Sequence, residues 1–533
     1  MRLISAVLAL VLSSTAQPQQ FRSDAIRAHM TFLASDALEG RGTATRGHRI
    51  AAEYVAAQYA LAGLEPGADG WYQDVPFVET IPGAASTVTL TRDGAQPVTL
   101  KMFEQFLSYG DPLHGEKTIE SAVVFAGYGV TAPAQKYDDY AGLDVKGKIV
   151  ALFGGAPDDF PNAVRAFHSS TPSKFENAAR HGAAGLIFLT SPRDAERVPW
   201  SRSVRQAKLG SMNWTRRDGS PHGVERTVSS SVTLDFETTR QLLGANAGAI
   251  FAAVERGNPR GAALPYRARI ALVSTHSTRT SPNVVGLLRG SDPKLRDEYL
   301  VYTSHLDHLG ISEPVVDSRG ESDAINNGAF DNASGIAVML EIARAMVDAK
   351  PRRSILFVAT TAEEKGMKGA DYFANNPPVP IDQLVGNINI DMPVMTHRTR
   401  DLMPYGVETN DLGDLVRNVA AEMKIELATD PFPEEVIFVR SDQIAFVRRG
   451  VPAIYIGSGF RATDPKIDAE RAYAQWLRTR YHSPKDDLQQ PIDWSAALLL
   501  TEFDYRLGLA AANRDARPQW KAGDFFGETF KRR

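Results

Sequence analysis

The sequence contains no cysteine among its 533 residues. This absence excludes disulfides, lipid attachment through a thiol, thiolate metal sites and a cysteine nucleophile. The chain must therefore be stabilised by its hydrophobic core, which a protein of this length can supply. Any metal ion would be held by histidine, aspartate and glutamate, a donor set suited to zinc or a harder divalent cation.

The sequence also lacks an excess of charge of either sign. It has 59 basic and 63 acidic side chains, which give a formal net charge of -4, and no block of like charge occurs. Nucleic-acid-binding proteins usually carry a basic patch or tail. We therefore expect no nucleic-acid partner.

Long hydrophobic runs are absent after the first residues. The start, "MRLISAVLALVLSSTAQPQQ", has an early positive charge, an apolar stretch from Leu3 to Leu12, and small residues at Ser14 and Ala16. This order is typical of a secretory signal peptide, although a buried N-terminal helix is an alternative. We expect a signal peptide at residues 1–18, a periplasmic or extracellular location and no membrane span, because the run is too short to cross a bilayer.

Residues 19–111 are interpreted as the N-terminal part of a domain whose main part is residues 265–533. "HRIAAEYVAAQYALAGLEP" has helical periodicity and ends at Gly63. The preceding "LEGRGTATRGH" is rich in glycine but lacks a phosphate-binding pattern, so we interpret it as structural packing.

Residues 112–264 have the pattern of a small α/β domain. "AVVFAGYGV", "GKIVALFGG" and "AAGLIFL" are short apolar runs that predict strands, and "SKFENAARHGA" predicts a helix. The polar stretches "SPRDAERVPWSRSVRQ" and "NWTRRDGSPHG" are interpreted as loops, which could form a lid or ordinary surface.

Residues 265–533 alternate strands and helices. Strands are predicted at "NVVGLLRG", "EYLVYTSH", "SILFVATT", "VGNINIDM" and "PAIYIGSG". Helices are predicted at "SGIAVMLEIARAMVDA", "NDLGDLVRNVAAEM" and "SAALLLTEFDYRLGLAAANRD". This alternation predicts an α/β fold with a mostly parallel central sheet covered by helices on both faces. In such folds, ligands bind beyond the carboxyl ends of the strands.

Two adjacent glutamates follow one of these predicted strands. In "RSILFVATTAEEKGMKGADYF", the apolar run Ile355–Ala359 precedes Glu363 and Glu364. Neighbouring carboxylates repel each other unless a cation or a shared proton holds them. The pair therefore indicates a nearby cation.

Other potential ligands lie at the ends of predicted strands or just before helices. Taken singly, Asp331 could cap a helix and Asp391 could begin a turn before Pro393. As a group, however, they fall where an α/β sheet places its ligand site, and their oxygen and nitrogen atoms suit two divalent ions. The group consists of His305, Asp307, His308, Asp331, Glu363, Glu364, Asp391 and His482.

Several of these stretches together resemble one known family. "SHLDHLG", "FDNASGIAVMLEIAR", "ATTAEEKGMKGADYF", "NIDM", "RSDQIAF", "GVPAIYI" and "YHSPKDD" are similar to motifs of the co-catalytic di-zinc aminopeptidases, which include bacterial secreted leucyl-type enzymes and are related to glutamate carboxypeptidase. "LDVKGKIVALFGG" and "FENAARHGAAGLIFL" resemble the protease-associated domain inserted in such enzymes. The resemblance implies a zinc-peptidase, phosphorylase/hydrolase-like fold.

The resemblance also implies two zinc ions per chain. Asp331 would bridge them, His305 and Asp391 would complete one site, and Glu364 and His482 the other.

The same resemblance assigns the catalytic roles. Glu363 would be the general base that takes a proton from water and passes it to the leaving amine of a peptide substrate. The carboxylate of Asp307 would fix the imidazole tautomer of His305. His308 matches the motif but receives no role.

One motif departs from the family pattern. The family's Ser-Asp-His appears here as Ser441-Asp442-Gln443, and the tyrosine found ahead of it in some members is absent. Stabilisation of the tetrahedral intermediate would then come from a zinc ion, from Arg440 or from another segment.

The sequence is compatible with four functions. The leading hypothesis is an exported aminopeptidase. A carboxypeptidase or dipeptidase on the same scaffold would use cationic side chains such as Arg440, Arg448 and Arg449. An acyl-transferring cyclase tends to use one metal, whereas ligands for two are present here. A non-catalytic binding protein is disfavoured because Glu363 and all five ligands are retained.

Overall fold

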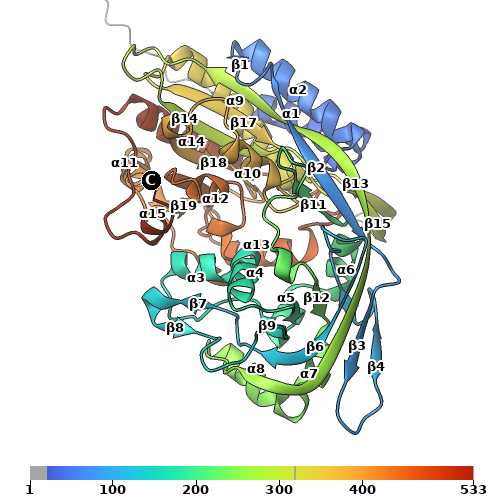
Figure 1. Ribbon diagram of the computed structural model, residues 1–533. Coiled ribbons are helices and arrows are strands. Elements are labelled where there is room, and N and C mark those ends of the chain that lie inside the picture. The colour runs from blue at the N-terminus through green and yellow to red at the C-terminus, as the bar shows by residue number, and fades with distance from the viewer. Residues whose placement is uncertain (1–20, 317–319, 532–533) are drawn as a thin grey trace, which may run out of the picture.

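The computed structural model describes residues 21–316 and 320–531, so the predicted signal peptide lies outside the described residues. The large β-structure consists of two groups of strands, which we call the main sheet and the second sheet. Among the described strands, only the 27-residue β13 (Ala262–Leu288) pairs in both. In Figure 1 it curves along the side of the molecule from one sheet to the other.

The main sheet is mixed, with a parallel centre. Its order is β11 (Ser211–Trp214), β2 (Tyr72–Pro82), β13, β17 (Ser354–Thr360), β14 (Tyr299–His305), β18 (Leu384–Asn389), β21 (Ala453–Ser458), β19 (Asp401–Tyr405) and β20 (Glu426–Leu427), and β1 (Glu65–Pro66) pairs with the end of β13. The strands β17, β14, β18 and β21 are parallel neighbours. The strands predicted in residues 265–533 are all present.

Helices cover both faces of the main sheet. On β14, Leu300 and Tyr302 join the core that is formed with one set of helices, whereas Tyr299 and Val301 face the other set. Such double-sided burial produces the continuous apolar runs seen in the sequence and confirms the predicted α/β class. The first set comprises α1 (Ser23–Leu33), α2 (Arg46–Ala62), α9 (Ser334–Ala349), α11 (Leu412–Met423) and α14 (Trp494–Asn513), and the second α10 (Lys368–Asn375) and α12 (Gln443–Val447).

The second sheet has its own hydrophobic core. Its strands are β4 (Val98–Lys101), β3 (Thr87–Thr91), β13, β6 (Glu116–Phe125), β9 (Ile149–Phe153), β10 (Gly185–Leu189), β12 (Ser231–Leu234) and β5 (Phe106–Leu107). It thus includes strands before residue 112 and the part of β13 beyond residue 264. Here β3 pairs with β13, β4 with β3, and β5 with β12, and the apolar pattern of residues 112–264 does not reveal these pairings. The division into a catalytic and a protease-associated domain stays a prediction.

The α-helices between β9 and β13 are α3 (Asn162–Ser169), α4 (Thr171–Arg180), α5 (Pro192–Arg197), α6 (Trp200–Lys208), α7 (Phe236–Leu243) and α8 (Ala247–Glu255). Two of them, α5 and α6, correct the sequence interpretation. The polar stretch interpreted as a loop over residues 191–206 is therefore largely helical. A capping box between Ser191 and Asp194, with Pro192 in the first turn, begins α5 and is the local signal for it. The second polar stretch begins within β11, which includes Asn213 and Trp214.

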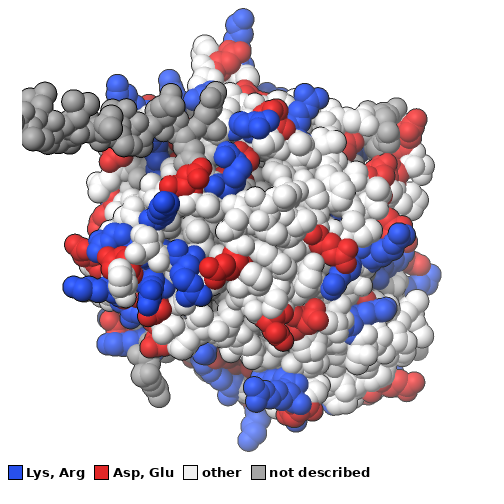
Figure 2. Space-filling view, turned by 90° about the horizontal axis from the view of Figure 1, so that it is seen from above, with Lys and Arg blue, Asp and Glu red and all other residues white. Residues whose placement is uncertain are grey.

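The surface shows no large field of one charge on the face seen in Figure 2, where acidic and basic side chains are interspersed among uncharged residues. Within residues 21–316 and 320–531, no helix is long and apolar enough to cross a membrane.

A buried carboxyl in α14 provides a test of stability against pH. Asp504 is 1% exposed and neither carboxyl oxygen has a hydrogen-bond partner. Burial raises the pKa of Asp504 well above its ordinary value, so the native state keeps this proton while the unfolded chain ionises above about pH 4. The native state then binds more protons than the unfolded state, and its free energy of unfolding falls by about 1.4 kcal/mol per pH unit until the native pKa is reached.

We therefore expect Asp504→Asn to be more stable than the parent chain at pH 8, with a smaller difference at pH 5.5. Urea denaturation at several pH values measures this. Glu502→Gln on the same helix is the matched control, because Glu502 is solvent-exposed and pairs with Arg506. An advantage for Asp504→Asn that is equal at all pH values would contradict the prediction.

Candidate metal centre

The carboxyl ends of three main-sheet strands meet at one site. His305 is the last residue of β14, Glu363 and Glu364 follow β17, and Asp391 follows β18. The loop before α9 supplies Asp331, and the turn after α13 (Ala469–Thr479) supplies His482. The site opens into a cavity of about 680 Å³ that lies between the main sheet and the second-sheet helices and is lined by His305, Asp331, Glu363 and Asp391.

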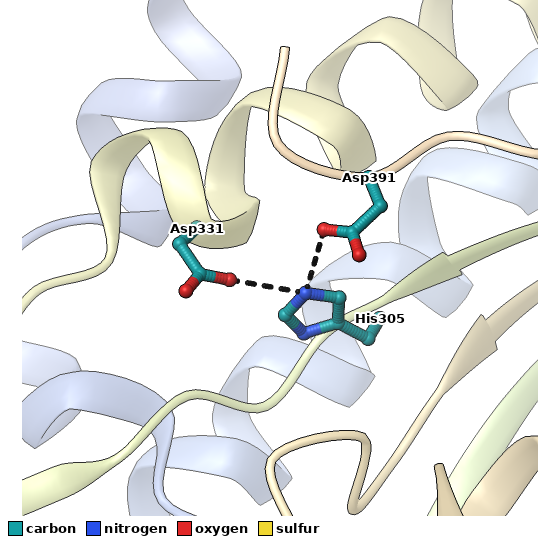
Figure 3. Close-up of side chains that lie close together, drawn as sticks. All are labelled: His305, Asp331 and Asp391. Atoms are coloured by element: carbon teal, nitrogen blue, oxygen red, sulfur yellow. Dashed lines mark hydrogen bonds and ion pairs between the residues drawn. The ribbon is translucent and has the colours of Figure 1, made fainter. Parts of the chain in front are cut away.

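The first group of potential ligands is centred on His305 (Figure 3). Its Nε2 lies 3.1 Å from an oxygen of Asp331 and 3.1 Å from an oxygen of Asp391. Its Nδ1 lies 3.0 Å from the main-chain oxygen of Asp307, to which it donates in the tautomer that leaves Nε2 unprotonated. Nε2 is thus directed between two carboxylates as a metal-binding nitrogen would be.

The second group lies on the other side of Asp331. The Nε2 of His482 is 3.2 Å from Asp331 Oδ2 and 3.0 Å from Glu364 Oε2. His308, which received no role from the sequence, places Nδ1 2.5 Å from Glu364 Oε1 and 3.8 Å from Asp331 Oδ2. His308 is therefore a further donor beside the five predicted ligands.

These atoms fit two divalent cations. Ligand atoms of His305, Asp331 and Asp391 lie within 4.8 Å of one another, and so do those of His308, Asp331 and Glu364. Asp331 belongs to both groups, with one carboxylate oxygen facing each, and its buried Oδ2 has no hydrogen-bond partner. An oxygen left without a hydrogen bond in a buried, polar site is suited to a metal ion.

The charges of the site favour bound cations. Burial opposes the charged form of His482, yet Glu364 and Asp331 raise its pKa to about 9. Burial likewise disfavours ionised Glu364, but His482 and His308 help to lower its pKa to about 2. The pKa of His305 is raised well above its ordinary value, because Asp391 and Asp331 outweigh burial. The carboxylates therefore attract positive charge to the space between them.

Glu363 differs from its neighbour. It lines the cavity but belongs to neither group of ligand atoms. Burial is the main cause that raises its pKa well above the ordinary value, and Asp391 and Glu364 add to the rise against the opposing charge of His305. The two adjacent glutamates thus differ in position: Glu364 lies among the potential metal ligands, whereas Glu363 lies at the cavity wall.

Asp307 makes contacts other than those expected from the sequence. Its carboxylate accepts a hydrogen bond from Thr43 Oγ1 at 2.8 Å and one from the main-chain nitrogen of Glu363 at 3.0 Å. The main-chain oxygen of Asp307, rather than its carboxylate, contacts the imidazole of His305. Since the chain turns directly after His305, the carboxylate is directed toward the Glu363 turn and fixes its position.

Other residues that hold the site were missed by the sequence analysis. Asp486 accepts from the main-chain nitrogens of Phe330 and Asp331, both at 3.0 Å, and so fixes the loop of the shared ligand. Buried Arg41 donates to the main-chain oxygens of Leu306, Leu33, Asn327 and Gly328. A glycine-rich stretch was the only local signal for Arg41. Of the residues whose main-chain oxygens it binds, Leu306, Asn327 and Gly328 lie 265 or more positions away.

The turns that carry the ligands have uncommon main-chain conformations. Ala362, Met392 and His482 have φ values of 56°, 43° and 54°, in the left-handed region that non-glycine residues rarely adopt. Such conformations cluster at functional sites, where the surrounding structure holds them. Their position next to Glu363 and Asp391, and at His482 itself, supports a functional role for this edge of the sheet.

The chain matches known proteins along this region. Residues 283–503 match the family model described as Peptidase family M28. A probable zinc metalloprotease of Pyrenophora teres f. teres (strain 0-1) is 38% identical over 109 residues, which cover 20% of this chain and 22% of that protein. Aminopeptidase NAALADL1 of Mus musculus is 26% identical over 369 residues, covering 58% and 43% respectively. The chain thus spans less than half of the length of these relatives.

A solved structure extends the fold comparison to nearly the whole chain. The aminopeptidase from Aneurinibacillus sp. strain AM-1 aligns with 93% of this chain and 95% of its own, with a TM-score of 0.54 and 19% identity. At this identity the likeness concerns the fold, and it includes both sheets.

Proposed function

Because residues 283–503 match the model of peptidase family M28, we propose that the chain is an exported aminopeptidase that binds two zinc ions and removes N-terminal residues from peptides. The observation that carries this proposal is Asp331, whose two carboxylate oxygens face His305 on one side and His482 on the other. The predicted signal peptide supports export, and the aminopeptidase and zinc metalloprotease names of the relatives support the activity.

The residues divide the chemistry between them. His305 and Asp391 would hold one zinc, Glu364 and His482 would hold the other, and Asp331 would contribute to both. Bound divalent ions of this kind supply an acidified water and polarise the scissile carbonyl. Glu363 accepts the proton of the attacking water and delivers it to the leaving amine, which breaks the peptide bond and releases the N-terminal residue. Asp307 holds the main chain of Glu363 in place for this transfer.

Arg440 is the cavity residue best placed to stabilise developing negative charge. It lines the cavity near Glu363 and donates to Glu435 Oε2 at 2.8 Å. A fixed cation beside the reacting carbonyl favours the transition state over the ground state. Arg440 would then take the place of the tyrosine that is absent from the motif ahead of Ser441, with part of its charge offset by Glu435.

The carboxypeptidase alternative also depends on arginines. Arg197, Arg202 and Arg440 line the cavity and could bind a substrate carboxylate. Arg197 and Arg440, however, both pair with Glu435 at 2.8 Å, which offsets part of their charge. Arg448 and Arg449 are not among the lining residues. The pairing with Glu435 therefore weighs against a substrate carboxylate at Arg197 and Arg440.

End-resolved digestion tests the proposal. The zinc-loaded and the chelator-treated chain are incubated with peptides that carry free or acetylated N-termini, and the products are identified by mass spectrometry. We expect zinc-dependent shortening from free N-termini only. Shortening from the C-terminus would establish the carboxypeptidase instead, and intact peptides with both metals bound would refute a peptidase of either kind.

A further inference from the structure

We infer that Gln206, on helix α6 beside the second sheet, is a positioning residue for the metal ligand His482. This inference rests on the proposed function, in which His482 binds one of two zinc ions. It assigns a role at the metal centre to a part of the chain outside the main sheet.

The contact joins the side chain of Gln206 to the far side of the imidazole. His482 directs Nε2 toward Glu364 and Asp331, and its Nδ1 lies within hydrogen-bond distance of the amide nitrogen Nε2 of Gln206. An imidazole that binds a metal through Nε2 carries its proton on Nδ1 and needs an acceptor there. The amide oxygen of Gln206 supplies one after rotation of the amide group, whose oxygen and nitrogen occupy equivalent positions.

The face of the same imidazole is also held. The ring of Tyr481 stacks on that of His482 with 3.7 Å between centroids. Arg202, one turn before Gln206 on α6, places its guanidinium 5.8 Å from the centroid of the Tyr481 ring. It also donates to the main-chain oxygens of Leu477 at 3.0 Å and Tyr481 at 3.4 Å. Helix α6 therefore fixes both the ring plane and the Nδ1 edge of His482.

The two residues that follow α6 contact the neighbour of the other ligand of this zinc position. Lys365, the neighbour of Glu364, donates from Nζ to the main-chain oxygens of Leu209 at 3.0 Å and Gly210 at 3.4 Å. By contrast, His305 is the last residue of β14 and Asp391 follows β18, and the imidazole of His305 contacts the main-chain oxygen of Asp307 and the carboxylate of Asp391. The zinc position formed by Glu364 and His482 therefore depends on α6, and the other position does not.

Zinc titration of the metal-free chain tests this asymmetry independently of activity. Gln206→Ala should weaken one of the two zinc-binding events by about 10- to 100-fold and leave the other unchanged. Gln206→Glu, which retains an acceptor for Nδ1, should restore most of the affinity. Ser203→Ala on the same helix is the matched control, and thermal unfolding of the metal-free variants checks that they fold as the parent does. In peptide assays at limiting zinc, Gln206→Ala should lower kcat more than it raises KM.

The outcomes separate the inference from the proposed function. Equal affinities of the parent and Gln206→Ala for both zinc ions would overturn the role of Gln206, even with full activity. Equal weakening of both binding events would also overturn it, since a general loss of structure would then be the cause. If the parent binds two zinc ions without shortening peptides, the proposed activity fails, whereas the comparison of affinities still decides the role of Gln206.

Discussion

Replacement of Glu363 by glutamine is expected to lower kcat by about 10²- to 10⁴-fold while both zinc ions remain bound. Glu363 lines the cavity yet lies outside both groups of ligand atoms, so its carboxylate is available to accept a proton. Glutamine has nearly the same shape but is not a base at neutral pH. Steady-state kinetics on the preferred peptide, together with metal analysis of the same sample, measure both parts of this prediction.

Glu364→Gln is the matched control, because it changes the adjacent residue in the same way. Glu364 contacts His308 and His482, so this variant should lose affinity for one zinc ion. That effect is separate from the proton transfer removed in Glu363→Gln. An empty metal position in Glu363→Gln would show that Glu363 is a ligand, and the assignment of the glutamate pair would then be wrong.

Replacement of Arg41 by methionine is expected to lower the free energy of unfolding by about 3–5 kcal/mol. The Arg41 side chain is 1% exposed and donates to four main-chain oxygens from three separate segments. Methionine fills much of the volume but leaves those oxygens buried without donors. The positive charge of Arg41 also lies near Asp331 and Asp307, so its loss increases repulsion among carboxylates.

Chemical denaturation with and without zinc measures this effect. Because zinc can offset the carboxylate repulsion, the loss should be larger for the metal-free chain. Arg41→Lys keeps the charge with fewer suitably placed donors and should fall between the parent and Arg41→Met. Arg46→Met, at an exposed position in the same stretch, is the control. A loss below about 1 kcal/mol for Arg41→Met would mean that the four oxygens find other donors.

The main sheet and the ligand cluster could be predicted from the sequence because their signals are local. Strands buried on both faces, such as Tyr299–His305, leave continuous apolar runs. The parallel order places their carboxyl ends together, and polar residues there, such as Asp391, stand out against those runs. The grouping of His305, Asp331 and Asp391 in space agrees with this reasoning.

What the sequence did not reveal depends on contacts between distant segments. The role of Arg41 is defined by main-chain oxygens far along the chain, and the relation of Gln206 to His482 joins residues 276 positions apart. Asp307 was predicted to contact His305 through its carboxylate, whereas the contact is made by its main-chain oxygen. Sequence spacing does not show in which direction the chain turns after β14. The strands β3, β4 and β5, which join the second sheet from before residue 112, were not foreseen for a similar reason, since pairing between strands leaves no composition signal.

The strand shared by the two sheets also has a mechanical consequence. From Ser274 to Val284, β13 is paired with β2 as a continuous antiparallel ribbon that passes between the sheets. The ribbon joins the two sheets, and the cavity is lined by residues from both parts of the molecule. A motion of one sheet against the other would bend the ribbon and strain the hydrogen bonds that join its strands. Under the proposed function, the stiffness of this ribbon would help to set the size of the peptide end that enters the cavity.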